Sequence, residues 1–226
     1  EFVENKDEEW EKQDCERKAC KRLMKRLKEM FPNLRICIGA DSLYANKPFF
    51  QACEEYHWRY IVRFKEGSIP TVAQECEALR KLDGNPGKGP NCRYDVVNGI
   101  DYEGHFLNYL KYAEDAKPHP FVFLTDLPLS HRNALATAFY GRRRWKIENQ
   151  GFNEQKNHGF ALGHFFSRNC QAMKNHDYLI QIGHTIAQIM DAWKSLWKDI
   201  RQSKEQKHRR ILESWKTHRL SDWMSI

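Results

Sequence analysis

The first third of the chain alternates strand-like runs with helical periodicity, and this alternation restricts the possible folds most. Apolar residues recur at spacings of three and four over residues 7–31, which predicts an amphipathic helix that ends at Pro32. We expect a short strand over residues 34–40, a helix over 48–56 and a strand over 60–64. This order of elements is typical of an α/β fold.

The pattern changes after residue 67. A short helix is expected over residues 71–82, followed by a Gly- and Pro-rich loop over 84–90. Two strands, 93–97 and 102–112, are separated by Asn98-Gly99, which is a hairpin signal. We therefore divide the chain into residues 1–67, the first part of an α/β core; 68–120, a small β-containing insertion; 121–190, the remainder of the core; and 191–226, a basic helical tail. In the remainder of the core, a strand at 121–124 precedes helices near His131, over 142–158 and from Leu179 onward.

The net charge of +7 is concentrated near the C-terminus. Residues 194–219 contain nine Lys or Arg and three acidic residues, interleaved with tryptophans. Such a tail is either a solvated helical face or a segment that binds a polyanion. No apolar run approaches the roughly 18 residues of a membrane span, and no signal peptide is recognisable. We therefore expect a cytoplasmic, nucleoid-associated protein without a membrane partner.

The seven cysteines include no Cys-x-x-Cys pair. Most fall on apolar faces of the expected elements, which favours reduced, buried thiols. His158, His164, Cys170 and His176 recur every six residues. Structural zinc sites do not favour that spacing, so we do not expect zinc.

Two carboxylates are candidates for chemistry. Asp41 directly follows the strand predicted for residues 34–40, at the end of a strand where α/β proteins usually place their sites. The alternative is that Asp41 only caps the turn before Ser42. Glu148 lies beside Trp145 and Ile147, whose apolar bulk argues against a freely solvated face, although an exposed ion pair with Arg144 is the simpler interpretation.

Three stretches in this order carry a family resemblance: GADSLYANKPFF, WRYIVRFKEG and RRRWKIENQGFNEQKNHG. They resemble the catalytic blocks of DDE transposases from bacterial insertion sequences, in the group with a Tyr-Arg-Glu-Lys signature. The likeness runs from about Glu1 to Met190. It implies an RNase H-like fold with a mostly β insertion before the helix that carries the catalytic Glu.

The resemblance assigns Asp41 as the second catalytic Asp and Glu148 as the catalytic Glu, and Arg144 fits the signature Arg. Tyr140 and Lys156 each lie one residue away from the signature spacing, which falls on Gly141 and Gln155. One residue is about 100° around a helix, so Tyr140 and Lys156 fit only if the helix is distorted near Gly151.

Other features depart from the family pattern. Thr125-Asp126-Leu127 stands where the family has Thr-Asn-Leu. The family's first catalytic Asp has no counterpart, and neither Asp101 nor Asp126 lies on an equivalent strand. We therefore interpret the chain as an N-terminally truncated fragment that begins near the third strand of the fold, at residues 1–4. On that interpretation the 226-residue chain by itself binds DNA without cutting it.

The resemblance also implies the chemistry. Two Mg²⁺ ions about 4 Å apart, which Mn²⁺ can replace, would stabilise the attacking and leaving oxygens of a phosphodiester, with carboxylates as ligands. Arg144 would grip a DNA phosphate, and Arg142, Arg143, Lys146, Lys156 and Tyr140 would add contacts to transposon ends and target duplex. The family suggests a homodimer. A catalytically dead DNA-binding remnant and an RNase H-fold nuclease are the alternative functions.

Overall fold

The computed structural model describes residues 2, 12–65, 67–83, 85–164, 166–192 and the single positions 203, 206, 209, 210 and 213. The chain forms two compact units, Glu1–Trp145 and Lys146–Ile226. Of the strand predicted for residues 1–4 only Phe2 is described, and most of the tail predicted for 191–226 lies outside the described residues. No described helix is long and apolar enough to cross a membrane.

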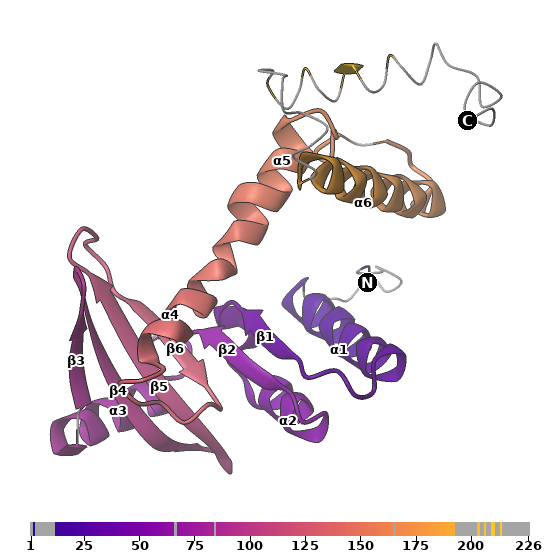
Figure 1. The fold of residues 1–226 in the computed structure, drawn as a ribbon. Coiled ribbons are helices and arrows are strands. Elements are labelled where there is room, and N and C mark those ends of the chain that lie inside the picture. Colours follow the sequence, from indigo (N-terminus) through magenta and orange to yellow (C-terminus); the bar gives the residue numbers. More distant parts are fainter. Residues whose placement is uncertain are drawn as a thin grey trace. The chain divides into compact units, whose positions relative to one another are not determined.

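The first unit is built on one six-stranded mixed sheet with the strand order β1-β2-β6-β5-β4-β3 (Figure 1). Only β1 and β2 pair in parallel among the described strands, and all other neighbours are antiparallel. The strands are β1 (Cys37–Ala40), β2 (Arg59–Arg63), β3 (Asn85–Gly89), β4 (Cys92–Tyr102), β5 (His105–Glu114) and β6 (Phe121–Thr125). The predicted α/β class is confirmed, and the sheet agrees with an RNase H-like core.

Helices cover both faces of this sheet. On one face α1 (Lys12–Met30), α2 (Lys47–Glu55) and α3 (Pro70–Asp83) contribute to a core that includes Phe50, Tyr60 and Val62. On the other face α4 (Ala134–Arg143) packs with Ile61 and Phe123. The alternation Tyr60, Ile61, Val62 along β2 therefore buries both sides of one strand, as period-two side-chain placement requires.

The hairpin predicted at Asn98-Gly99 is wrong. Strand β4 continues through both residues, and the turn is formed by Glu103 and Gly104, which both have positive φ angles of 52° and 87°. Asn98-Gly99 instead forms a bulge, because the pairing with β5 shifts between Val97 and Ile100. Both of these apolar residues belong to the same core, which the bulge permits by adding a residue between them.

The loop predicted for residues 84–90 is also wrong over Asn85–Gly89, which form edge strand β3 paired with β4. Pro86 is tolerated because one side of an edge strand makes no ladder hydrogen bonds. A Cβ on Gly87 would lie 2.3 Å from Cζ of Tyr94, so the glycine makes room for that ring. Packing against a neighbouring strand, which turn signals do not encode, decides this segment.

Strands β3, β4 and β5 extend the same sheet as β1, β2 and β6. The residues assigned to an insertion, 68–120, therefore contribute α3 and three strands to a continuous sheet. The boundary between the compact units falls at Trp145 and Lys146. The four-part division of the chain remains a prediction.

The second unit begins with a π-helix, Ile147–Phe152, which passes directly into α5 (Asn153–Asn157). Helix α6 (Cys170–Ala192) follows, and it starts nine residues earlier than the apolar pattern at Leu179 indicated. The polar side chains of Gln155, Gln181 and His184 join α5 to α6, with Gln155 Nε2 3.0 Å from Nδ1 of His184.

The cysteines only partly match the expectation of buried thiols. Cys53, Cys76 and Cys92 are buried, but Cys37 and Cys170 are exposed and Cys20 is intermediate. All six carry free thiols. Burial raises the pKa of Cys53 to about 12, with smaller contributions from nearby acidic groups.

Candidate functional site

Asp41 lies at the carboxyl end of β1, as the sequence predicted. Ala40 pairs with Val62 of the parallel strand β2, so Asp41 lies beside Arg63 where the two strands end. The Asp41 carboxylate caps a short 3₁₀ helix, Ser42–Tyr44, and Oδ1 accepts a hydrogen bond of 3.0 Å from the Leu43 amide. The carboxyl ends of parallel strands form the usual site edge of an α/β sheet.

The cap uses one oxygen of the carboxylate, and no described group donates to Oδ2 of Asp41. The structural interpretation of Asp41 as a turn residue is thus correct, and it leaves an oxygen to bind a ligand. Carboxylate oxygens are the donors that Mg²⁺ prefers. The residue therefore fits the metal that a two-ion phosphoryl-transfer site needs.

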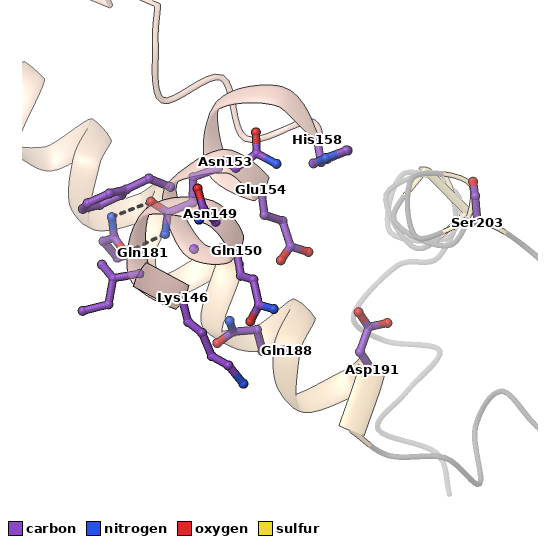
Figure 2. Close-up of a pocket in the computed structure, with 14 residues that line it drawn as sticks. Lys146, Asn149, Gln150, Asn153, Glu154, His158, Gln181, Gln188, Asp191 and Ser203 are labelled. Atoms are coloured by element: carbon purple, nitrogen blue, oxygen red, sulfur yellow. Dashed lines mark hydrogen bonds between the residues drawn. The ribbon is translucent and has the colours of Figure 1, made fainter. Parts of the chain in front are cut away.

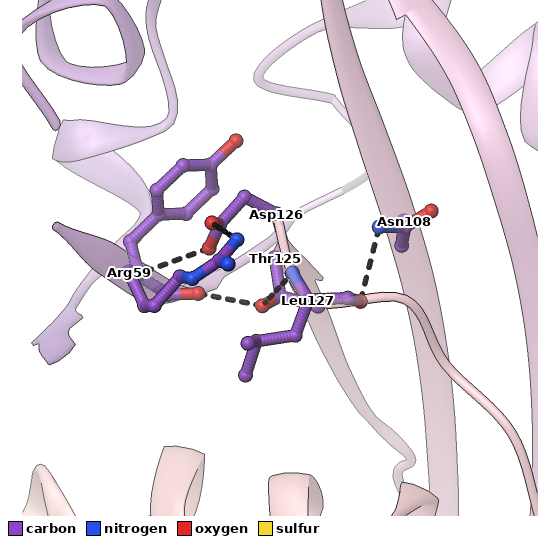
Figure 3. A network of polar contacts seen from close by, with 6 residues as sticks. Arg59, Asn108, Thr125, Asp126 and Leu127 are labelled. Atoms are coloured by element: carbon purple, nitrogen blue, oxygen red, sulfur yellow. Dashed lines mark hydrogen bonds and ion pairs between the residues drawn. The ribbon is translucent and has the colours of Figure 1, made fainter. Parts of the chain in front are cut away.

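Asp126 and Asp101 lie at the opposite end of the sheet. Asp126 binds Arg59, with Oδ2 2.7 Å from Nη1, and accepts the Tyr60 amide at 3.0 Å (Figure 3). Both partners begin β2, whereas Asp41 lies beyond its far end, roughly 10 Å of strand away. Asp101 caps the β4–β5 turn by accepting the Gly104 amide at 2.9 Å. Neither carboxylate can join Asp41 in one metal site.

Thr125 fixes the turn that follows β6. Its hydroxyl donates to the Tyr60 carbonyl at 2.6 Å and accepts from the Leu127 amide at 3.1 Å (Figure 3). Asn108 Nδ2 donates to the Leu127 carbonyl at 3.0 Å. The Thr-Asp-Leu segment, a departure from the family pattern, therefore serves to join β2, β6 and β5 at the end of the sheet away from Asp41.

Three consecutive arginines end α4 near the Asp41 edge. Arg142 forms an ion pair with Glu114 and lies over the Phe121 ring. Arg143 is exposed, with its guanidinium 5.4 Å from the centre of the Phe139 ring. Arg144 is partly exposed, and its charge acts on Arg63. The ion pair with Glu114 already offsets the charge of Arg142. That these arginines bind DNA remains a prediction.

Arg63 is a residue that the sequence analysis missed. Its guanidinium is half-buried over Phe121 and Phe123, at 4.7 Å and 5.7 Å from the ring centres. Burial and the positive charge of Arg144 lower the pKa of Arg63. One signal could have revealed it. Position 63 carries a basic residue near the end of a strand whose other residues are mostly apolar.

Glu148 belongs to the π-helix of the second unit. The Asn153 amide donates to the carbonyls of both Glu148 and Gln150, so the turn at Glu148 closes over five residues. Trp145 and Ile147 are 54% and 55% exposed, and Glu148 is exposed too, so the expected apolar shielding is not observed. π-turns occur often at functional sites.

The π-helix changes the alignment of Lys156 with Glu148. A π-turn takes one residue more than an α-turn, so each residue beyond it falls one position, about 100°, behind the regular helix. Lys156 then takes the face that residue 155 would occupy in an uninterrupted α-helix. Gln155 is buried against α6, whereas Lys156 is exposed. The distortion near Gly151 on which the fit of Lys156 depended is thus present.

The π-helix begins only at Ile147 and does not correct the one-residue offset of Tyr140 from the signature spacing. The signature spacing falls on Gly141, which is buried, and a Cβ there would lie 2.7 Å from Cε1 of Phe123. Tyr140 itself is 57% exposed, and its ring packs edge-on to Phe139 at 5.6 Å. Position 141 therefore has no room for a tyrosine, and a DNA contact by Tyr140 remains a prediction.

A groove runs along the π-helix within the second unit (Figure 2). Amide side chains dominate its lining, among them Asn149, Gln150, Asn153, Gln181 and Gln188, and Lys146 borders it. Glu148 is not one of the lining residues.

Asp41 and Glu148 belong to different units, so their approach to each other remains a prediction. Within the part of the chain that the structure describes, no three His, Cys, Asp or Glu side chains gather into a metal site.

A sequence profile described as "Transposase DDE domain" matches residues 13–186. The match covers more than half of the chain and includes both candidate carboxylates. A search of curated proteins finds no significant match.

Proposed function

The chain belongs to the transposase DDE domain family, and we propose that the product of its gene catalyses metal-dependent DNA cleavage and strand transfer at the ends of a bacterial insertion sequence. The family acts in DNA transposition, binds DNA and uses divalent metal ions. The proposal concerns the particular steps, the DNA ends and the residues that perform them.

In this proposal Asp41 and Glu148 are two of the carboxylates that hold a pair of Mg²⁺ ions, or Mn²⁺ in their place. When bound, the metal ions offset the charge that develops on the oxygens of the reacting phosphodiester. Arg144 would hold a DNA phosphate through two parallel hydrogen bonds, and Lys156 would supply a point charge to another. The remaining basic residues would attract the DNA backbone without reading its sequence.

One observation carries the assignment. Asp41 follows directly from β1 at the carboxyl end of the one parallel pair among the described strands, with one carboxylate oxygen left by its cap. The π-turn supports the same assignment because it brings Lys156 into phase with Glu148. A DNA-binding remnant would need neither feature, and a nuclease would share both.

A transposition assay in cells tests the proposal and separates these functions. The gene that encodes this chain is supplied with DNA that carries the ends of its element, and both cleaved and joined DNA are measured. We expect Asp41→Asn and Glu148→Gln to abolish both products. Asp101→Asn is the matched control, because Asp101 lies at the opposite end of the sheet and the amide can still accept the Gly104 hydrogen bond.

Cleavage without joined products would replace the transposase proposal with a nuclease. DNA binding without either product would indicate a remnant. Full activity of Asp41→Asn or Glu148→Gln would show that the catalytic carboxylates are assigned wrongly.

A further inference from the structure

Three positively charged side chains lie close to one aromatic ring at the end of the sheet where Asp41 lies. The Phe121 ring lies 4.7 Å from Cζ of Arg63, 4.8 Å from Cζ of Arg142 and 5.2 Å from Nζ of Lys117. These residues, together with Glu114, are called the Phe121 cluster. All of them belong to the first unit.

The strand order explains why they meet. Arg63 ends β2, Phe121 begins the neighbouring strand β6, and Glu114 ends the next strand, β5. Arg63 alternates with Val62 and so points to the face that α4 covers, where the last turn of α4 supplies Arg142. The electron-rich face of an aromatic ring attracts cations, so Phe121 orients their charges.

The cluster carries more positive charge than its own acidic residue offsets. Glu114 forms ion pairs with both Arg142 and Lys117, and its Oε2 lies 3.0 Å from Nζ of Lys117. Arg63 has no carboxylate partner among the described residues, and the one hydrogen bond that its guanidinium makes to them is a long one of 3.5 Å, from Nη2 to the Pro120 carbonyl. Its Nη1 is buried without any hydrogen-bond partner.

Holding Arg63 in this state is costly for the folded protein. A donor on a charged group that is buried without a hydrogen bond destabilises the folded state more than a neutral donor does. The positive charge of Arg144 also repels the Arg63 guanidinium. Arg63 is partly exposed, so an anion at this edge would accept hydrogen bonds from the exposed part of its guanidinium and offset the excess charge.

We propose that the Phe121 cluster binds a DNA phosphate next to Asp41, with Arg63 as the main contact and Phe121 as a positioning residue. This inference rests on the proposed function, which brings a phosphodiester to Asp41. Ala40 pairs with Val62, so Asp41 and Arg63 are adjacent along the sheet edge. A phosphate bound to Arg63 would flank the reacting one. The guanidinium fork matches two phosphate oxygens.

The salt dependence of DNA binding tests the cluster. Each phosphate that a protein neutralises contributes about 0.9 to the slope of log K against log salt concentration. We expect Arg63→Gln to make this slope shallower by about 1 and to weaken binding equally across duplex sequences. Arg59→Gln is the matched control, because Arg59 lies on the same strand at the opposite end and pairs with Asp126. Its slope should not change.

Two further variants probe the arrangement. Glu114→Gln removes the one acidic residue of the cluster, so we expect tighter DNA binding. Phe121→Leu keeps the apolar bulk but removes the π face, so binding should weaken while every charge is retained. A role of Phe121 in packing alone would leave the DNA affinity of the folded variant unchanged.

Circular dichroism establishes that each variant is folded. Should Arg63→Gln fail to fold, Arg63→Lys and Glu114→Gln decide: the lysine should keep the salt slope but bind more weakly. Unchanged slope and affinity in Arg63→Gln, or in both substitute variants, would overturn the cluster while leaving the proposed function intact. Absence of any DNA binding by the unaltered chain would contradict both.

Discussion

Replacing Thr125 with Val tests how the sheet is joined at the end opposite Asp41. The side chain is fully buried, and its hydroxyl serves both the Tyr60 carbonyl and the Leu127 amide. Valine has nearly the same shape, so packing changes little while both backbone groups lose a partner. A buried group left without its hydrogen bond costs about 1–3 kcal/mol, and partial relaxation at two groups gives an expected loss of about 2–3 kcal/mol.

Thr125→Ser is the matched control because it keeps the hydroxyl and removes only a methyl group. That change costs about 1 kcal/mol. Urea unfolding followed by circular dichroism measures both free energies, and an unchanged denaturant slope shows that the variants unfold from comparable states. A valine variant as stable as the serine variant, or more stable, would refute the role assigned to the hydroxyl.

Gly141→Ala should destabilise the first unit by about 1–3 kcal/mol because the new methyl group meets the Phe123 ring, whereas Gly151→Ala, with open space around it, should not lower the urea midpoint. Lys156→Gln should weaken DNA binding without changing stability. Gln155→Ala, at a buried hydrogen-bonded position, should lower stability without changing the DNA affinity of the folded protein. Stability should fall as pH rises from about 8.5, the usual thiol pKa, toward about 12, because the folded state keeps the Cys53 proton that the unfolded state releases; Cys53→Ala should flatten this dependence in urea titrations.

The sequence predicted the elements whose signals are local. The helix that ends before Pro32, the helix that starts near Pro48 and the strand before Asp41 each have a periodic pattern and a clear boundary. The middle of the chain was less predictable because Asn98-Gly99 is as suitable for a bulge as for a hairpin turn. The choice depends on which register buries Val97 and Ile100 on one face, and that is a property of the whole sheet.

The candidate site shows the same limit. Asp41 could be placed from the sequence because its strand and its position at the strand end are both local features. Arg63 could not, because its importance depends on Phe121 and Arg142, which come from distant segments. The sequence showed only that Lys156 would fit if the helix were distorted near Gly151, and the backbone hydrogen bonds show that a π-turn is present there.

A crystal structure of the protein with Mn²⁺ and DNA that carries the element's ends tests the central claim most directly. The measurement is the separation of the Asp41 and Glu148 carboxylates. Two ions about 4 Å apart with shared ligands require that the two carboxylates lie within about 8 Å of each other. We expect this separation, with an anomalous signal from Mn²⁺ next to each carboxylate. Carboxylates more than about 15 Å apart, well beyond the reach of a shared pair of ions, would contradict the assignment of these residues to one catalytic site.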